Sequence, residues 1–548
     1  MKGAAAEYAK GLKLSRACTG TAGHEFEAEV GTLLGHALAR AGQWAAAEAA
    51  LRKAILHSHY AEHLEVRSNP ADDAAGFIDE KRRYLETYEN AFRDLETALI
   101  RQGKIEDALL IADERRAVTV RQIRAARSGA TSAGPRSTSD LRRIASSQAV
   151  TFVVYSATEY WPSAGFSNGP MLGRNCSAQP PARSLHIWVI GPSGRVESRS
   201  VDLSTPGLRA MAGDTDRSGA YLQAAVRHLR DVIAEKAPLT GASGTGAAAG
   251  ERSSDALRFL YDLLIAPVAD LLPTTPGAEV VFIPDGSLHY VPFAALQAKD
   301  GTYLIDRYTI RLLVSLGDVD TQTRSANQKA PSDHALVVAN PRPMPDDLPP
   351  LFGAEREAES VATVLGTTPL IGDRATLQTV LERLPSAEIV HFATHAVFDE
   401  EYGYMSYLVL VPPGPEGIRV ATEDGMLFLS GDEGAAAKGH LTAETISDLH
   451  LRAKVAVLSA CNTGRGDITG EGVSGLASAF LSAGAGSVVV ALWSVPDLST
   501  ESLMTEFYHS LHGGSGTAAA LREAMLKTRA RTSSPRAWAG FELLGAGS

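Results

Sequence analysis

A histidine and a cysteine each follow a short apolar run, at the point where a buried strand would give way to a polar loop. His395 follows the run Ile389–Ala393, and Cys461 follows the run Val455–Ala460. In an open α/β sheet, ligands bind beyond the carboxyl ends of the strands, so two such ends bring an imidazole and a thiol together. This pair predicts a cysteine nucleophile with a histidine partner.

The cysteine needs an activating group, because a thiol with its ordinary pKa of about 8.5 is mostly protonated at neutral pH. Cys461 has no charged neighbour before Arg465, and the residues around it are small. Small neighbours let a substrate carbonyl approach the sulfur and leave backbone N–H groups to face an oxyanion. We expect His395 to activate the thiol. From position alone, an interpretation of both side chains as core residues stays open.

Two other kinds of site compete for the same region. His391 and His395 lie four residues apart, on one face of a strand, but no third ligand stands at a recognisable spacing, so we expect no metal. His391 is expected to fill the core beneath His395. Gly470–Gly475 matches a dinucleotide-binding fingerprint, with Asp497 further on. Because about ten residues separate it from the preceding strand, we favour a loop packed beside the cysteine and expect no cofactor.

Composition indicates an ordinary multidomain globular protein. The 548 residues carry a net charge of -11, which argues against nucleic acid as the main partner. The three cysteines lie far apart, and neither a signal peptide nor an apolar run of about 18 residues is present. We expect a cytoplasmic protein with no membrane segment.

The chain divides into a helical part and an α/β part. Residues 1–125 read as helices, and Leu34–Ala54 carries the small and large positions of a tetratricopeptide-like hairpin, repeated from Gly103; a generic helical bundle is the alternative. Residues 126–147 form a Ser/Gly/Arg linker. From 148 to 548, strands alternate with helices, which predicts a mostly parallel sheet covered on both faces. A long excursion at 412–440 separates the two candidate residues.

Several short motifs, in order, resemble the CHAT domain, a caspase-like family often found with tetratricopeptide repeats. They are Ile283–Leu288, Val291–Leu296, Gly353–Glu355, His391–His395, Leu441–Ile446, Leu458–Gly464, Gly472–Leu476, Phe480–Ala485 and Leu492–Val495. The resemblance covers roughly 148 to 545, with the His/Cys half at about 330–548.

The resemblance implies a caspase-like α/β fold and a cysteine endopeptidase of clan CD. Carried over by position, Cys461 is the nucleophile, and His395 is the general acid and base. The backbone N–H groups of Cys461 and Ala396 would form the oxyanion hole. The family usually has glycine where this chain has Ala396, so a positive φ at this position would be costly and could alter the oxyanion geometry.

The same resemblance implies where a peptide would bind. Trp493, Ser494 and Val495 would pair with it as an added strand, with Trp493 either walling a subsite or filling the core. Acidic residues surround the presumed opening of the active site in sequence: Asp399, Asp467 and Glu471. By charge complementarity, a basic P1 residue is one expectation.

The implied role is a regulated protease that cuts a specific protein partner. Relatives of this architecture act in bacterial defence, including antiviral defence, or in cell death, and the helical region would receive an activating protein or signal. The alternative is a catalytically weak or inactive scaffold in which both parts bind protein partners.

Overall fold

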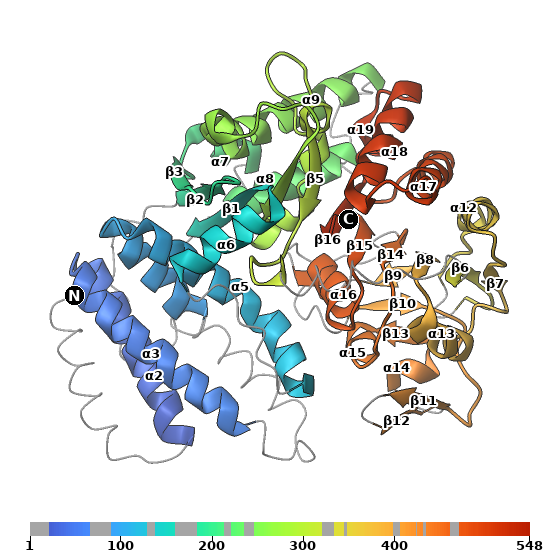
Figure 1. The fold of residues 1–548 in the computed structure, drawn as a ribbon, viewed down its shortest axis with the longest axis horizontal. Helices are drawn as coiled ribbons and strands as arrows, with labels where there is room; N and C mark the ends of the chain where they lie inside the picture. The colour runs from blue at the N-terminus through green and yellow to red at the C-terminus, as the bar shows by residue number, and fades with distance from the viewer. Residues whose placement is uncertain are drawn as a thin grey trace. The chain divides into compact units, whose positions relative to one another are not determined.

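The computed structural model (Figure 1) describes residues 21–65, 89–128, 137–158, 184–212, 221–234, 246–319, 334–344, 348–397, 406–422, 425–430, 434–460 and 471–547. These residues divide into two compact units. Described residues up to Arg143 form the first unit, and Ile144–Ala157 together with the described residues from Ser184 onward form the second. Helix α6 (Thr138–Gln148) contains the point at which the chain passes from one to the other.

The first unit is built from helical hairpins. In the first hairpin, α2 (Thr21–Arg40) packs on α3 (Trp44–Glu65), and Gly35 lies so close to Leu51 that any Cβ there would clash. The turn passes through Gly42 at φ +72°, a conformation that glycine adopts without steric cost. Small residues therefore set how closely the two helices approach.

A second hairpin repeats this geometry. Residues 89–101 are helical, α5 (Ile105–Ser128) follows them, and the turn between them passes through Gly103 at φ +74°. Within the unit, His36 pairs with Asp94 at 3.0 Å across the two hairpins. The expected tetratricopeptide-like helical region is therefore confirmed.

An 11-stranded sheet runs through the second unit, in the order β3-β2-β1-β4-β5-β16-β15-β14-β8-β6-β7. Its strands are β1 (Thr151–Thr158), β2 (Ser184–Ile190), β3 (Val196–Asp202), β4 (Ala278–Ile283), β5 (Tyr308–Leu312), β6 (Ala335–Pro341), β7 (Leu370–Gly372), β8 (Ile389–Ala393), β14 (Val455–Leu458), β15 (Ser487–Ala491) and β16 (Phe541–Gly545).

Most neighbouring strands of this sheet are parallel. The pairs β1–β4, β4–β5, β6–β7, β6–β8, β8–β14 and β14–β15 are all parallel, whereas β2–β3 is antiparallel. The last strand, β16, lies between β5 and β15, parallel to the first and antiparallel to the second. It therefore joins two groups of strands that are separate in sequence.

The helices of the second unit supply the layers on the sheet. They are α7 (Pro206–Ala212), α8 (Tyr221–Ile233), α9 (Gly246–Leu264), α10 (Leu304–Arg307), α12 (Phe352–Leu365), α13 (Leu377–Arg383), α14 (Gly434–Ala437), α15 (Ala443–Ser447), α16 (Glu471–Ser482), α17 (Asp497–His512), α18 (Thr517–Arg531) and α19 (Pro535–Trp538).

Two adjacent residues of β8 show that both faces of the sheet are covered. Successive side chains of a strand point to opposite faces. His391 lies against Glu357 of α12 and Tyr508 of α17, whereas the ring of Phe392 lies 6.1 Å from the ring of Phe480 of α16. The expected mostly parallel α/β sheet with helices on both faces is therefore confirmed.

Smaller strands lie beside the carboxyl end of β8. The strands β9 (Ala396–Val397), β10 (Tyr407–Val409) and β13 (His440–Thr442) form a three-stranded sheet. The long excursion between the candidate residues is not plain loop where it is described, because it contains the hairpin of β11 (Ile418–Thr422) and β12 (Gly425–Leu429).

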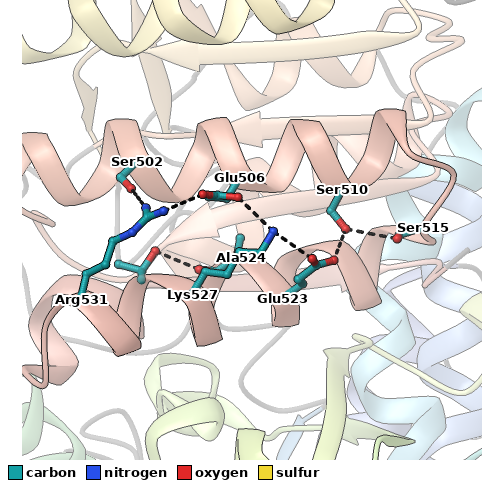
Figure 2. Close-up of polar contacts among 9 residues, drawn as sticks. Ser502, Glu506, Ser510, Ser515, Glu523, Ala524, Lys527 and Arg531 are labelled. Carbon is teal, nitrogen blue, oxygen red and sulfur yellow. Dashed lines mark hydrogen bonds and ion pairs between the residues drawn. The ribbon is translucent and has the colours of Figure 1, made fainter.

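Helices α17 and α18 are linked by a polar network along their exposed sides (Figure 2). Glu506 accepts hydrogen bonds from Arg531 at 2.8 Å and from Lys527 at 3.1 Å. Lys527 also pairs with Glu523, which accepts a hydrogen bond from Ser510. No described helix of the chain is both long enough and apolar enough to cross a membrane.

Candidate active site

The strands that carry the two candidate residues are direct neighbours. β8 and β14 run parallel, and the register pairs Phe392 with Leu458. Both strands are apolar because both faces are covered, and every residue of β14 is buried. The carboxyl ends of β8 and β14 therefore meet at one edge of the sheet, as the sequence predicts.

His395 is held in one orientation by backbone groups. Its Nε2 lies 2.8 Å from the carbonyl oxygen of Pro349, and its own carbonyl accepts a hydrogen bond from the backbone N–H of Val409 at 2.9 Å. A carbonyl oxygen only accepts hydrogen bonds, so Nε2 carries the proton when the ring is neutral. The lone pair of the neutral ring is then on Nδ1.

That second ring nitrogen is buried. His395 is only 3% exposed, and no group among the described residues hydrogen-bonds its Nδ1. A buried basic nitrogen that the described residues leave without a hydrogen bond is suited to exchange a proton with a reacting group. The residues before it are fixed, because Thr394 is fully buried and donates a hydrogen bond from its hydroxyl to the carbonyl of Val409 at 2.7 Å.

The second candidate residue lies outside the described residues. Cys461 belongs to the undescribed segment 461–470, as does Asp467, and Asp399 belongs to 398–405. The description of the second strand end stops at Ala460, which is fully buried. Glu471 is the first residue of α16. The roles of these four residues remain predictions.

The residue after the histidine adopts ordinary strand backbone. Ala396 begins β9 and pairs with Leu408 of β10, and it is not among the described residues with positive φ. Alanine at this position is therefore unstrained, and the steric cost considered from the sequence does not arise. Its predicted part in an oxyanion hole remains a prediction.

The segment after β15 is largely built into the core. Trp493 is 2% exposed, and its indole N–H donates to the carbonyl of Arg536 at 2.9 Å. Val495 is also buried, whereas Ser494 is exposed. Of the three predicted peptide-binding residues, Ser494 is the one whose side chain faces solvent.

His391 lies in the core, as the sequence suggests. It is fully buried, with Nδ1 3.1 Å from the Tyr508 hydroxyl and Nε2 3.1 Å from Oε1 of Glu357. The second contact is close enough for an ion pair, although its angle falls short of a hydrogen bond. Burial raises the pKa of Tyr508 well above 10, and the charge of Glu357 adds to this effect.

No metal or nucleotide site emerges from the described part of the chain. No three His, Cys, Asp or Glu side chains there are grouped so that they could hold a metal ion. The glycine fingerprint is divided, because Gly472 and Gly475 already lie in α16 and β14 ends at Leu458. A dinucleotide fingerprint needs its first glycines in the turn directly after the strand.

Sequence reasoning missed Asn340, which binds the chain segment just after Pro349. Asn340, at the end of β6, accepts a hydrogen bond from the backbone N–H of Leu351 at 2.7 Å and donates one to Glu355 at 2.6 Å. The available signal was an asparagine and two prolines directly after an apolar run, a pattern typical of a turn with special backbone geometry.

Comparison with known proteins identifies one domain. The family model of the CHAT domain matches residues 254–546. Tetratricopeptide repeat protein 28 of Mus musculus is 34% identical over 326 residues, and its Homo sapiens counterpart is 33% identical over the same length. Each match covers 53% of this chain but only 13% of the relative, so the chain spans a small part of their length.

Two solved structures also match. One is the Saccharomyces cerevisiae separase–securin complex, which is 12% identical in sequence and has a TM-score of 0.41. The match covers 99% of this chain and 37% of that chain. The other is the Arg-specific cysteine proteinase gingipain R, which is 12% identical in sequence and has a TM-score of 0.31. The match covers 58% of this chain and 74% of that chain.

Proposed function

The chain belongs to the CHAT domain family, and from this premise we propose that it is a cysteine endopeptidase with Cys461 as nucleophile and His395 as acid and base. The observation that carries the proposal is the state of His395. Its Nε2–H is committed to the Pro349 carbonyl, and its buried Nδ1 has no hydrogen bond from the described residues. This is the arrangement that a general base requires.

The position of the cysteine in the chain supports the same proposal. Leu458 pairs with Phe392 across β14 and β8, and Cys461 and His395 each follow three residues later. Neighbouring strands lie about 4.8 Å apart, so equivalent positions just beyond two paired strands begin close together. We therefore expect the thiol to come within reach of the imidazole.

In this mechanism, Nδ1 of His395 takes the proton of the Cys461 thiol. The thiolate attacks the scissile carbonyl carbon, and backbone N–H groups of Cys461 and Ala396 stabilise the oxyanion. The imidazolium, stabilised by the Pro349 carbonyl, then gives its Nδ1 proton to the leaving amine as the C–N bond breaks. Water, deprotonated by Nδ1, hydrolyses the thioester and regenerates the thiol.

The substrate is a protein partner, and the exposed Ser494 marks where an extended peptide would pair with the chain. Trp493 and Val495 would hold that segment in place from the core. Asp399, Asp467 and Glu471 favour a basic residue at P1 by charge complementarity. The helical hairpins would bind the activating protein, in a defence or cell-death pathway.

The test is a comparison of protein N-termini by mass spectrometry in cells that express the wild type, Cys461→Ala, His395→Ala or, as a matched control, Cys176→Ala. We expect new N-termini with the wild type and the control, and none with the other two. All four proteins should still unfold cooperatively, which would show that a loss of cutting is not a loss of the fold; His395→Ala should have a somewhat lower midpoint, because it removes a buried hydrogen bond. Cutting that persists in Cys461→Ala would exclude this nucleophile.

The alternative is a catalytically weak or inactive scaffold, and it draws on the relatives, whose name refers only to tetratricopeptide repeats. A thiol-reactive probe separates the two functions. An activated Cys461 should alkylate much faster than Cys18 or Cys176. Equal rates at all three cysteines, with an activating partner present, would favour the scaffold.

A further inference from the structure

Asn340 has an unusual conformation for a buried residue. It lies at the end of β6, is fully buried and has φ +40°, and the β6–β7 register shifts at this point. A non-glycine residue with positive φ is uncommon and costs free energy, although asparagine tolerates it better than most. Such a residue is retained where its side chain is needed in one direction.

Both polar atoms of the Asn340 side chain form hydrogen bonds. Its Oδ1 accepts the backbone N–H of Leu351 at 2.7 Å, and its Nδ2 donates to Oε1 of Glu355 at 2.6 Å. Arg342 approaches the same carboxylate oxygen at 2.8 Å. Leu351 precedes α12, which has no side-chain cap of its own, so Asn340 satisfies a backbone N–H at the start of that helix.

These contacts fix the chain segment that binds the candidate histidine. Leu351 is two residues after Pro349, whose carbonyl accepts the hydrogen bond from Nε2 of His395 at 2.8 Å. Glu355 lies one turn further along α12, so Asn340 is bonded both to the segment before the helix and to the helix itself. A rotation of this segment would carry the Pro349 carbonyl away from the ring.

We propose that Asn340 and Glu355 are positioning residues, which we call the carbonyl clamp: they hold the Pro349 carbonyl where it selects the Nε2–H tautomer of His395. This inference rests on the proposed peptidase function. Without the carbonyl, the imidazole could rotate or place its proton on Nδ1, and it would then no longer accept the thiol proton. A misplacement of about 1 Å in such a group costs up to about 100-fold in rate.

The clamp is tested in the full chain. Cys461 is alkylated with iodoacetamide at a series of pH values from 5 to 10, and the rate of its modification is measured by peptide mass spectrometry. Asn340→Gly is the sharpest variant, because glycine keeps the positive φ while it removes the side chain. Glu355→Ala breaks the clamp from its other side, and Glu355→Gln still offers an oxygen to the Asn340 amide. Ser360→Ala is the control, because it removes another hydrogen bond of α12, to Glu501.

We expect Asn340→Gly and Glu355→Ala to slow alkylation at pH 7 by about 10- to 100-fold. The midpoint of their pH profiles should rise towards about 8.5, the ordinary value of a thiol. Glu355→Gln should recover most of the wild-type rate, and Ser360→Ala should retain it. A lower unfolding midpoint with an unchanged pH profile in both clamp variants would overturn the inference, since it would indicate a structural role only.

The two proposals fail in different ways. If Cys461 of the wild type alkylates no faster than Cys18 and Cys176, the peptidase function is contradicted. If the wild-type Cys461 is fast and both clamp variants are equally fast, the function stands and the clamp is wrong.

Discussion

Gly353 and Asp497 touch at the starts of two packed helices, α12 and α17. A Cβ on Gly353 would stand 2.6 Å from the Cβ of Asp497, closer than any real pair of side chains. Gly353 is buried and lies between the Pro349 segment and Glu355. Helix α17 can therefore pack this close to α12 only because residue 353 is a glycine and has no side chain.

Gly353→Ala should lower the unfolding midpoint by a few degrees. Alanine is favoured over glycine within a helix by about 1 kcal/mol, but overpacking costs about 1–3 kcal/mol, so the clash should outweigh the propensity. The double variant Gly353→Ala/Asp497→Gly removes the clashing side chain and should recover much of the loss. Additive effects in this double-mutant cycle, measured by thermal unfolding, would show that the two residues do not interact.

Glu542→Gln should stabilise the protein at neutral and alkaline pH. Burial raises the pKa of Glu542 well above 4.5, against the effect of its hydrogen bond from the Phe293 N–H. The folded state holds this proton more tightly than the unfolded chain, so its carboxyl costs stability increasingly as the pH rises above about 4.5. Glutamine avoids that cost while its carbonyl still accepts from Phe293.

The measurement is the difference in unfolding midpoint between Glu542→Gln and wild type from pH 4 to 9. The difference should be small near pH 4 and grow with pH. Glu279→Gln is the matched control, because Glu279 lies in the same sheet, on β4, and pairs with Arg311 of β5, the strand between β4 and β16. That variant should be less stable than wild type at pH 7, so stabilisation by both variants would contradict the assignment.

Arg230→Ala should destabilise the carboxyl end of β15. The guanidinium lies 4.4 Å from the centre of the Tyr290 ring and donates a hydrogen bond to the Leu492 carbonyl at 3.2 Å. Loss of a charge-assisted hydrogen bond costs about 1.5–3 kcal/mol, and the partial exposure of this one places it near the lower value. Arg230→Lys keeps the charge but not the planar stacking, so its unfolding midpoint in a thermal melt should be intermediate. A wild-type midpoint in Arg230→Ala would refute this role.

Lys527→Met should lower stability in a manner that depends on salt and pH. Lys527 joins Glu506 of α17 to Glu523 of α18 (Figure 2). Burial alone would raise the pKa of Glu506, but hydrogen bonds from Arg531 and Lys527 outweigh it and hold the pKa below 4.5. The stabilisation is therefore present above about pH 4.5 and is lost as the pH falls below it.

The loss in Lys527→Met should be measurable as a lower unfolding midpoint at pH 7 in low salt and should shrink in 1 M NaCl, where exposed charges are screened. Lys438→Met is the control, because Lys438 is exposed and makes no ion pair with described residues. A salt-independent difference would point to packing instead of charge.

The sheet strands that could be predicted are those with continuous apolar runs. β8 has the predicted bounds Ile389–Ala393, because such a run marks a strand buried on both faces. β16 was missed, since a glutamate interrupts it and glycines flank it. Its place in the centre of the sheet depends on pairing with β5 and β15, which are distant in sequence. Local patterns carry no information about such pairing.

In the candidate site too, some features could be predicted from the sequence and others could not. His395 could be found because residue type and position at a strand end are visible in a sequence. The Pro349 carbonyl could not, because every residue has a carbonyl and only the fold selects which one meets the ring. Asn340 and Glu355 come together from different elements through a turn, and their spacing has no periodic signature.

The position of β16 has a consequence for how the molecule is made. This strand, Phe541–Gly545, follows every other described strand in the sequence, yet it lies between β5 and β15. Until it inserts, each of those strands has an unpaired edge, and such edges recruit other chains. The strands that carry His395 and lead to Cys461 can therefore join the rest of the sheet only when synthesis has passed residue 545.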